Sequence, residues 1–207
     1  MQIAEPTTTL TDYAMGAVSL VLGAQLVASG TRGSSTPQTL WGMGLLATGV
    51  ASLIGGSSHG FAPYLSTDAR AAFWRATYGT VGMANLLILA AAAAFTLRGA
   101  AGSVAVFALT ARLALYLALI TSRPEFRYVV YDYALTLLAL AVFAVHGRHR
   151  AWPWAGWTMA GIGVSLVGAL IQRSGLALHR YFNHNDLFHV VQTIGIYLYY
   201  RAGAQLH

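Results

Sequence analysis

Two histidines, an aspartate and two asparagines stand together at the head of the last long apolar stretch of the chain. The segment reads Asn183-His184-Asn185-Asp186-Leu187-Phe188-His189, and a mainly apolar stretch follows from Val190 to Tyr200. Polar groups in apolar surroundings are costly unless they are paired, hydrated or bound to a metal. The segment is therefore the first candidate for a functional site.

The spacing of these residues limits the chemistry that they can share. Asp186 and His189 are three residues apart and Asn185 and His189 are four apart, so either pair shares one face of a helix. A metal ion could bind His189 together with Asp186, or with His184 if the helix begins after His184. The simpler alternative is an N-terminal helix cap, in which Asn or Asp accepts hydrogen bonds from free backbone N–H groups. The sequence leaves both alternatives open.

Composition places the chain in a membrane. Hydrophobic residues make up 57% of the 207 residues, charged residues only 9%, and the mean hydropathy is +0.58. Soluble domains carry about 25% charged residues. We expect a single transmembrane domain spanning residues 1–207, a multi-pass protein of a bacterial inner membrane. Residues 1–10 lack the basic region of a signal peptide, so the first apolar segment should be retained.

Three classes of function are excluded or disfavoured by residues that are missing or scattered. Cysteine is absent, which excludes disulfides and thiolate chemistry. All twelve basic residues are arginines, so the chain has no lysine to form the Schiff base of a retinal protein. The arginines are spread through the loops without a basic run, and we therefore expect no nucleic-acid partner.

The apolar pattern predicts an all-α fold of seven transmembrane helices in one bundle. Segments of about 20 apolar residues are long enough to cross a bilayer. The expected helices are Thr11–Ser29, Thr39–Ser57, Ala71–Leu97, Gly102–Thr121, Phe126–His146, Trp152–Gln172 and Asp186–Ala202. Because the connections are short, successive helices must alternate in direction. The N-terminus and the second, fourth and sixth connections then lie on one face, which we call side A.

The charged residues divide unequally between the two faces. All six acidic residues fall on side A or in the side-A half of a helix: Glu5, Asp12, Asp68, Glu125, Asp132 and Asp186. The arginines that lie near either face divide almost evenly, six against five. Membrane orientation follows the count of Lys and Arg, so it stays undecided.

Polar residues from other helices should meet the seventh helix on side A. The second helix ends in Ser57-Ser58-His59, which places two hydroxyls and an imidazole at the level of His184 and His189. Helical bundles build metal sites in this way, from side chains on facing helices. A catalytic zinc ion would need three protein ligands and an open position for water.

Two arginines near or within the apolar segments also need an explanation. Arg75 lies just inside the side-A boundary of the third helix, where it could extend to lipid headgroups or bind an anionic substrate group. Arg112 and Asp132 should lie at the same depth, roughly 10 to 13 Å from side A. We interpret them as a structural ion pair, with Asp132 as a proton acceptor or substrate anchor as the alternative. The five tryptophans mostly fall near helix ends, as in an interfacial belt.

Taken together, these residues resemble a known superfamily of membrane hydrolases. Seven helices, a histidine after serine at the end of the second, and Phe188-His189 near the start of the seventh are similar to alkaline ceramidases, adiponectin receptors and haemolysin III proteins. The opening Thr7-Thr8-Thr9-Leu10-Thr11-Asp12-Tyr13 also resembles the entry of alkaline ceramidases. The resemblance covers nearly the whole chain by topology, through short motifs.

The resemblance implies a zinc ion whose bound water hydrolyses an amide. It places His59 as the ligand from the second helix and His189 as the last ligand from the seventh. Asn185 stands where the family has its other histidine, with His184 one position earlier, and Gly55 stands where it has serine. The family's aspartate on the third helix has no clear counterpart.

These observations favour a zinc-dependent hydrolase of a lipid amide or ester. His59, His184 and His189 would bind the metal, Asp186 or Asp132 would act as base, and Ser57 or Ser58 would stabilise the oxyanion. A non-enzymatic accessory or lipid-binding subunit of a larger membrane complex, with a protein partner, is the second hypothesis. Haem binding by His59 and His189 is the third. Membrane lipid is the expected partner in either of the first two.

Overall fold

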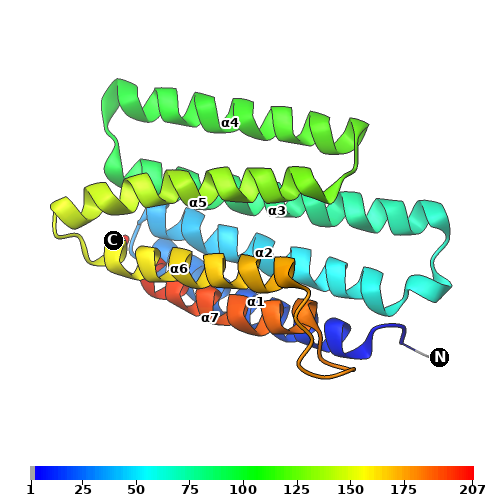
Figure 1. Cartoon of the computed structure of the whole chain (residues 1–207). Coiled ribbons are helices and arrows are strands. Elements are labelled where there is room, and N and C mark those ends of the chain that lie inside the picture. The colour runs from blue at the N-terminus through cyan, green and yellow to red at the C-terminus, as the bar shows by residue number, and fades with distance from the viewer. Residues whose placement is uncertain (1–2) are drawn as a thin grey trace.

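Seven α-helices and one short 3-10 turn form the chain (Figure 1). The computed structural model describes residues 3–207, and within this range no β-strand occurs. The helices are α1 (Pro6–Arg32), α2 (Thr36–Gly60), α3 (Thr67–Thr96), α4 (Gly99–Ser122), α5 (Phe126–His149), α6 (Pro153–Ser174) and α7 (His184–Gly203), with the 3-10 turn η1 (Ala62–Tyr64) between α2 and α3. The prediction of an all-helical fold is confirmed.

Six of the helices, α1 to α6, are long and apolar enough to cross a membrane. The seventh, α7, has 20 residues, and its first two turns carry His184, Asn185, Asp186 and His189. The helices alternate in direction, so the starts of α1, α3, α5 and α7 lie at one end with the ends of α2, α4 and α6 (Figure 1). This end is side A, on the right in that view.

Local sequence signals begin and end these helices. Proline occupies the first turn of α1, α2 and α6, where its missing N–H costs nothing. The hydroxyls of Ser35 and Ser66 accept hydrogen bonds from the first turns of α2 and α3. Helix α6 ends at Gly175, whose φ of +67° is left-handed and favours glycine.

Helices α1 and α2 approach each other closely along a row of glycines. A Cβ atom added at Gly42 would lie 2.8 Å from the backbone nitrogen of Val27 and 2.9 Å from the carbonyl oxygen of Gly23. Nearer side A, a Cβ at Gly56 would lie 2.8 Å from the Cβ of Asp12. Only glycine leaves room for this contact, which holds α1 against α2 while its other side faces α7.

The main core lies at the opposite end from side A and is built around two tryptophans. Trp41 and Trp154 are fully buried, with ring centroids 6.4 Å apart in an edge-on arrangement. The indole nitrogen of Trp41 donates a hydrogen bond to the carbonyl of Tyr199 on α7, at 2.8 Å. The expected interfacial belt is therefore wrong for these two residues. An indole can be buried at low cost when its N–H finds a partner, as in Trp41.

Helix α4 lies at the edge of the bundle, beyond α3 and α5 (Figure 1). Only two of its residues, Tyr116 and Ile120, are buried. Its main polar attachment is Arg112, whose Nη2 lies 2.6 Å from Asp132 Oδ1 and also donates to Thr136 Oγ1 at 2.6 Å. The other carboxylate oxygen of Asp132 accepts a hydrogen bond from Asn85 at 2.7 Å. We call Arg112, Asp132, Thr136 and Asn85 the Arg112 clasp, which joins α3, α4 and α5.

Breaking the Arg112 clasp should destabilise the fold. Replacing Arg112 by leucine leaves the Asp132 carboxylate buried without its cation, which costs about 3 to 5 kcal/mol for pairs of this kind. We expect a clearly lower thermal unfolding midpoint for Arg112→Leu in detergent. Arg127→Gln breaks an exposed pair with Glu125 and should leave the midpoint unchanged. Equal midpoints for Arg112→Leu and wild type would contradict a structural role.

The glycine row makes a separate prediction about helix packing. Gly42→Ala forces α1 and α2 apart because the new methyl group meets backbone atoms, and overpacking of this kind costs about 1 to 3 kcal/mol. Gly163→Ala is the matched control, since nothing lies within 4 Å of a Cβ added at that position on α6. The thermal unfolding midpoint should fall for Gly42→Ala and stay or rise for Gly163→Ala. A similar change in both variants would show that helix propensity, and not close contact, governs these sites.

Candidate functional site

The start of α7 is a helix cap and a tertiary contact at once. The side chain of Asn183 accepts a hydrogen bond from the backbone N–H of Asn185, and Asp186 Oδ2 accepts one from the backbone N–H of Asn183, both at 2.7 Å. The second oxygen of Asp186 accepts a hydrogen bond from Thr8 Oγ1 on α1, at 2.8 Å. Asp186 is completely buried. One carboxylate therefore both caps α7 and binds α1.

His189 lies one turn further along α7 and contacts α1 through both ring nitrogens. Its Nδ1 is 3.0 Å from Thr11 Oγ1, and its Nε2 is 3.2 Å from Asp12 Oδ1. Asp12 and His189 are both buried, with 5% and 8% of their surface exposed. We call Thr8, Thr11, Asp12, Asp186 and His189 the α1–α7 cluster. A hydroxyl, an imidazole and a carboxylate in series are the elements of acyl-transfer chemistry.

His59 adjoins this cluster from the end of α2. Its Nδ1 lies 3.2 Å from Glu5 Oε2, and its ring meets the ring of Trp74 edge-on at 5.3 Å. Glu5 thus lies beside His59 and Asp12 beside His189, while Asp186 lies one turn before His189 on α7. Three carboxylates and two imidazoles thus gather at side A. Asp12, Asp186 and His189 are the buried members of this group, and buried charges must be balanced by one another or by protons.

The two candidate serines of α2 take different positions. The hydroxyl of Ser57 donates to the carbonyl of Leu53 at 2.7 Å and lies 2.8 Å from the hydroxyl of Tyr13 on α1. Ser58 is fully buried, and its hydroxyl has no hydrogen-bond partner among residues 3–207. Gly56 and Gly60 face α1, and Ser58 lies between them in sequence, about 200° around the helix from Gly56. Ser57 therefore contacts α1 through Tyr13, which follows Asp12 in the sequence, whereas Ser58 has no such contact.

The remaining candidate residues lie away from the cluster. Asp132 belongs to the Arg112 clasp, where both of its carboxylate oxygens are already bonded. Arg75 is exposed on α3. Asn185, which stands where the resembling family has a histidine, accepts a hydrogen bond from Gln172 on α6 at 2.6 Å. His184 is half-buried at the first position of α7, five residues before His189, so the two do not share a helix face.

The arrangement of these side chains does not suit a zinc ion. Zinc in a catalytic site takes three protein ligands that point at one centre. Within residues 3–207, no group of three or more His, Cys, Asp or Glu side chains is placed to hold a metal ion. His59 and His189 each contact a carboxylate, and His184 joins neither of them. The residues present do not fit a zinc site, and zinc stays a prediction from the resemblance.

The contribution of α1 was largely missed by reasoning from the sequence. Thr8, Thr11 and Asp12 are three and four residues apart, so they share one face of α1, whose first turns also carry Thr7 and Thr9. That spacing was the available signal. It does not reveal which helix the face meets, because the neighbour of α1 depends on the packing of the whole bundle.

Comparison with known proteins gives one match. No curated protein and no solved structure matches the chain. A family model described as a family of unknown function, DUF6962, matches residues 7–207. The matched range includes the α1–α7 cluster, His59 and the Arg112 clasp, and leaves out Glu5. The chain therefore belongs to the DUF6962 family.

Proposed function

We propose that the chain is a multi-pass membrane protein of seven spans whose α1–α7 cluster hydrolyses a lipid amide or ester. The observation that carries this proposal is the position of His189 between Thr11 Oγ1 at 3.0 Å and Asp12 Oδ1 at 3.2 Å. Nucleophile, base and orienting carboxylate stand in that order in the hydrolases that use a catalytic triad. The order does not depend on a metal ion.

The tautomer of His189 follows from its neighbours. A carboxylate beside Nε2 favours the proton on that nitrogen, which leaves Nδ1 free to accept a proton. The Thr11 hydroxyl donates to the carbonyls of Thr7 and Thr8 at 3.0 and 3.1 Å, so it must turn towards Nδ1 before His189 can take its proton. In this state Asp12 fixes the ring and stabilises the positive charge that develops when His189 is protonated. The cation is then paired inside a buried site, where pairing is most needed.

The reaction proceeds in two stages on these residues. Thr11 Oγ1 attacks the acyl carbon while His189 Nδ1 takes its proton. His189 then returns this proton to the leaving amine or alcohol, and an acyl ester on Thr11 remains. Water attacks the ester with its proton passing to His189, and the return of that proton to Thr11 releases the fatty acid.

The lipid class of the substrate is proposed from the surroundings of the cluster. The cluster lies at the side-A end of a bundle whose first six helices are apolar enough for a bilayer. Burial of Asp12, Asp186 and His189 limits the access of water. A substrate with long apolar chains would approach along the helices, with its amide or ester bond at the depth of the polar residues.

We count α7 as the seventh membrane span because of its length and its position in the bundle. Its 20 residues span about 30 Å, which matches the hydrocarbon core of a bilayer. Its polar first turns are satisfied by α1 and α6, so they need not face lipid. A bacterial inner membrane remains the proposed location.

Substitutions in the cluster test the proposed chemistry. Thr11→Val removes the nucleophile, and His189→Gln removes the base, so each should lower hydrolysis of fluorescent lipid amides and esters by about 10³- to 10⁴-fold. Thr11→Ser keeps a hydroxyl and should remain active. Intact mass spectrometry after a short reaction should show the acyl group on the wild-type chain.

Matched variants control for the fold. Thr80→Val removes a hydroxyl on α3 that donates to the carbonyl of Ala76 in its own helix, and it should keep full activity. If Thr11→Val retains activity and His189→Gln loses it, the nucleophile is a water molecule and not Thr11. If no lipid amide or ester is cleaved and a partner protein co-purifies, the hydrolase hypothesis is wrong and the hypothesis of an accessory or lipid-binding subunit takes its place.

Metal analysis separates this scheme from the zinc-dependent one. We expect no stoichiometric metal in protein purified in mild detergent without added metal, as measured by elemental mass spectrometry. About one zinc per chain, lost in both His59→Ala and His189→Ala, would overturn the metal-free scheme. A haem Soret band lost in the same two variants would instead establish the haem hypothesis.

A further inference from the structure

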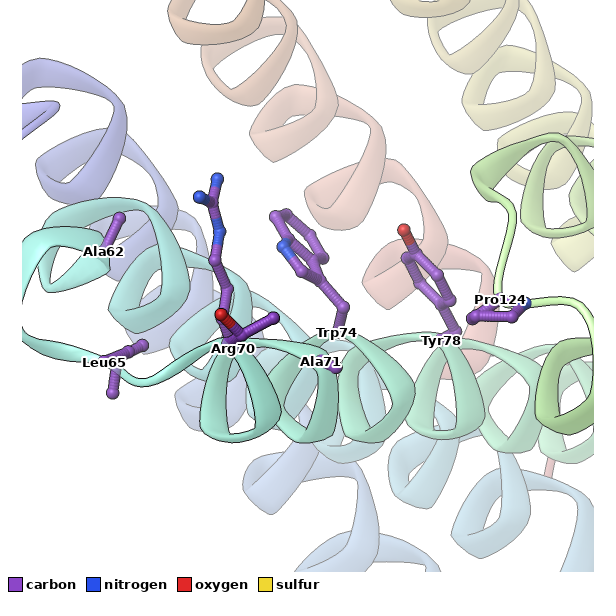
Figure 2. A pocket seen from close by; sticks show the side chains of 8 residues that line it. Ala62, Leu65, Arg70, Ala71, Trp74, Tyr78 and Pro124 are labelled. Carbon is purple, nitrogen blue, oxygen red and sulfur yellow. The ribbon is translucent and has the colours of Figure 1, made fainter.

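An open cleft of about 410 Å³ lies at side A, next to the α1–α7 cluster but outside it. Its walls come from the connection between α2 and α3, from α3 itself, and from Pro124 between α4 and α5 (Figure 2). Arg70, Trp74 and Tyr78 line it from α3. These three residues are each four apart, so they form one face of the helix, and Figure 2 shows all three rising from the same side of α3.

Arg70 gives the cleft its charge. Among the lining residues that belong to the described range, 3–207, Arg70 is the one charged residue and none is an acid. Within residues 3–207 the Arg70 guanidinium forms no hydrogen bond or ion pair, and only the backbone N–H of this residue is engaged, by the carbonyl of Ser66 at 2.9 Å. Glu125, which follows Pro124, is already paired with Arg127 at 2.8 Å. The guanidinium is thus available to an anion, and its planar set of N–H donors matches the oxygens of phosphate.

The aromatic residues complete a site suited to an amphipathic molecule. Trp74 lies beside His59 on one side and Tyr78 on the other, with ring centroids 5.3 and 5.8 Å away. Tyr78 is buried and contacts Phe126, a half-exposed residue at the start of α5. A path of aromatic surface therefore runs from Arg70 towards the apolar flank of α5. Tryptophan and tyrosine favour this boundary between headgroups and hydrocarbon.

The position of the cleft along α3 matches the lipid headgroup layer of a bilayer. Arg70 follows the first residue of α3 by three positions, or about 4.5 Å along the axis. Arg75 lies five residues further along α3, and the helix carries no charge from Ala76 to Thr96. If α3 crosses the bilayer, Arg70 lies at the level of the lipid phosphates while Tyr78, two turns deeper, lies at the level of the first acyl carbons.

We propose that this cleft binds an anionic phospholipid, with Arg70 on the phosphate and Trp74 and Tyr78 against the glycerol and upper acyl chains. An anionic headgroup is preferred to a zwitterionic one because the lining has no carboxylate to accept an ammonium group. The proposal concerns binding and does not rest on hydrolysis by the α1–α7 cluster. On the side of α2, Trp74 of the cleft contacts the ring of His59, which is paired with Glu5.

Lipid titration of the whole chain tests the proposal. The purified protein in detergent is titrated with phosphatidylglycerol or phosphatidylcholine, and bound lipid is counted by native mass spectrometry. Arg70→Ala should weaken phosphatidylglycerol binding by about tenfold or more, because it removes a charge-assisted hydrogen bond. Arg70→Lys should recover part of the loss. Phosphatidylcholine should bind weakly in every variant.

Arg173→Ala is the matched control, since Arg173 is an exposed arginine in the last turn of α6 on side A and lies outside the cleft. It should bind phosphatidylglycerol as wild type does. Equal losses in Arg70→Ala and Arg173→Ala would overturn the proposal in favour of general surface charge. Binding of inorganic phosphate that depends on Arg70, without binding of phosphatidylglycerol, would overturn it in favour of a soluble phosphate compound. Thermal unfolding midpoints verify that each variant is folded.

Discussion

The close approach of α1 to α2 is the constraint on which the polar end of the molecule depends. At Gly23, Gly42 and Gly56 the two helices leave no room for a Cβ atom. Helix α1 is thereby fixed in rotation as well as in position, because any turn about its axis would bring larger side chains into its contact with α2. Because α2 covers the glycine side of α1, the face carrying Thr8, Thr11 and Asp12 meets α7. The glycines between α1 and α2 thus determine that Asp12 of α1 meets α7.

The structure stabilises its buried carboxylates in two different ways. Asp132 is neutralised by an arginine and by the amide of Asn85, which leaves neither of its oxygens free. Asp12 has an imidazole as its partner, and Asp186 has a hydroxyl and a backbone N–H. A guanidinium is permanently charged, whereas an imidazole gains and loses a proton readily. The first arrangement suits a fixed structural joint, and the second suits a site where protons move.

Much of the fold could be read from the sequence, because long apolar segments with Gly, Ser and Pro between them leave few alternatives to helices. The first helix begins earlier than expected, at Pro6 and not Thr11, since threonines at a helix start resemble a cap even when they are helical. Asp186 and His189 stood out because polar groups are rare in such surroundings. Arg70 and the α1 face did not, because their significance depends on which helices lie beside them.

The unequal distribution of acids described above has a cause in the backbone. A helix carries a partial positive charge at its N-terminus, which favours a carboxylate there by about 0.3 to 1 kcal/mol. Glu5, Asp68, Glu125 and Asp186 stand at the starts of α1, α3, α5 and α7. With an odd number of alternating helices, four N-termini face side A and three face the other side. The helix dipole therefore accounts for where four of the six acids stand on their helices. It does not account for the whole skew, because α2, α4 and α6 begin at the other face with no acid in their first turn.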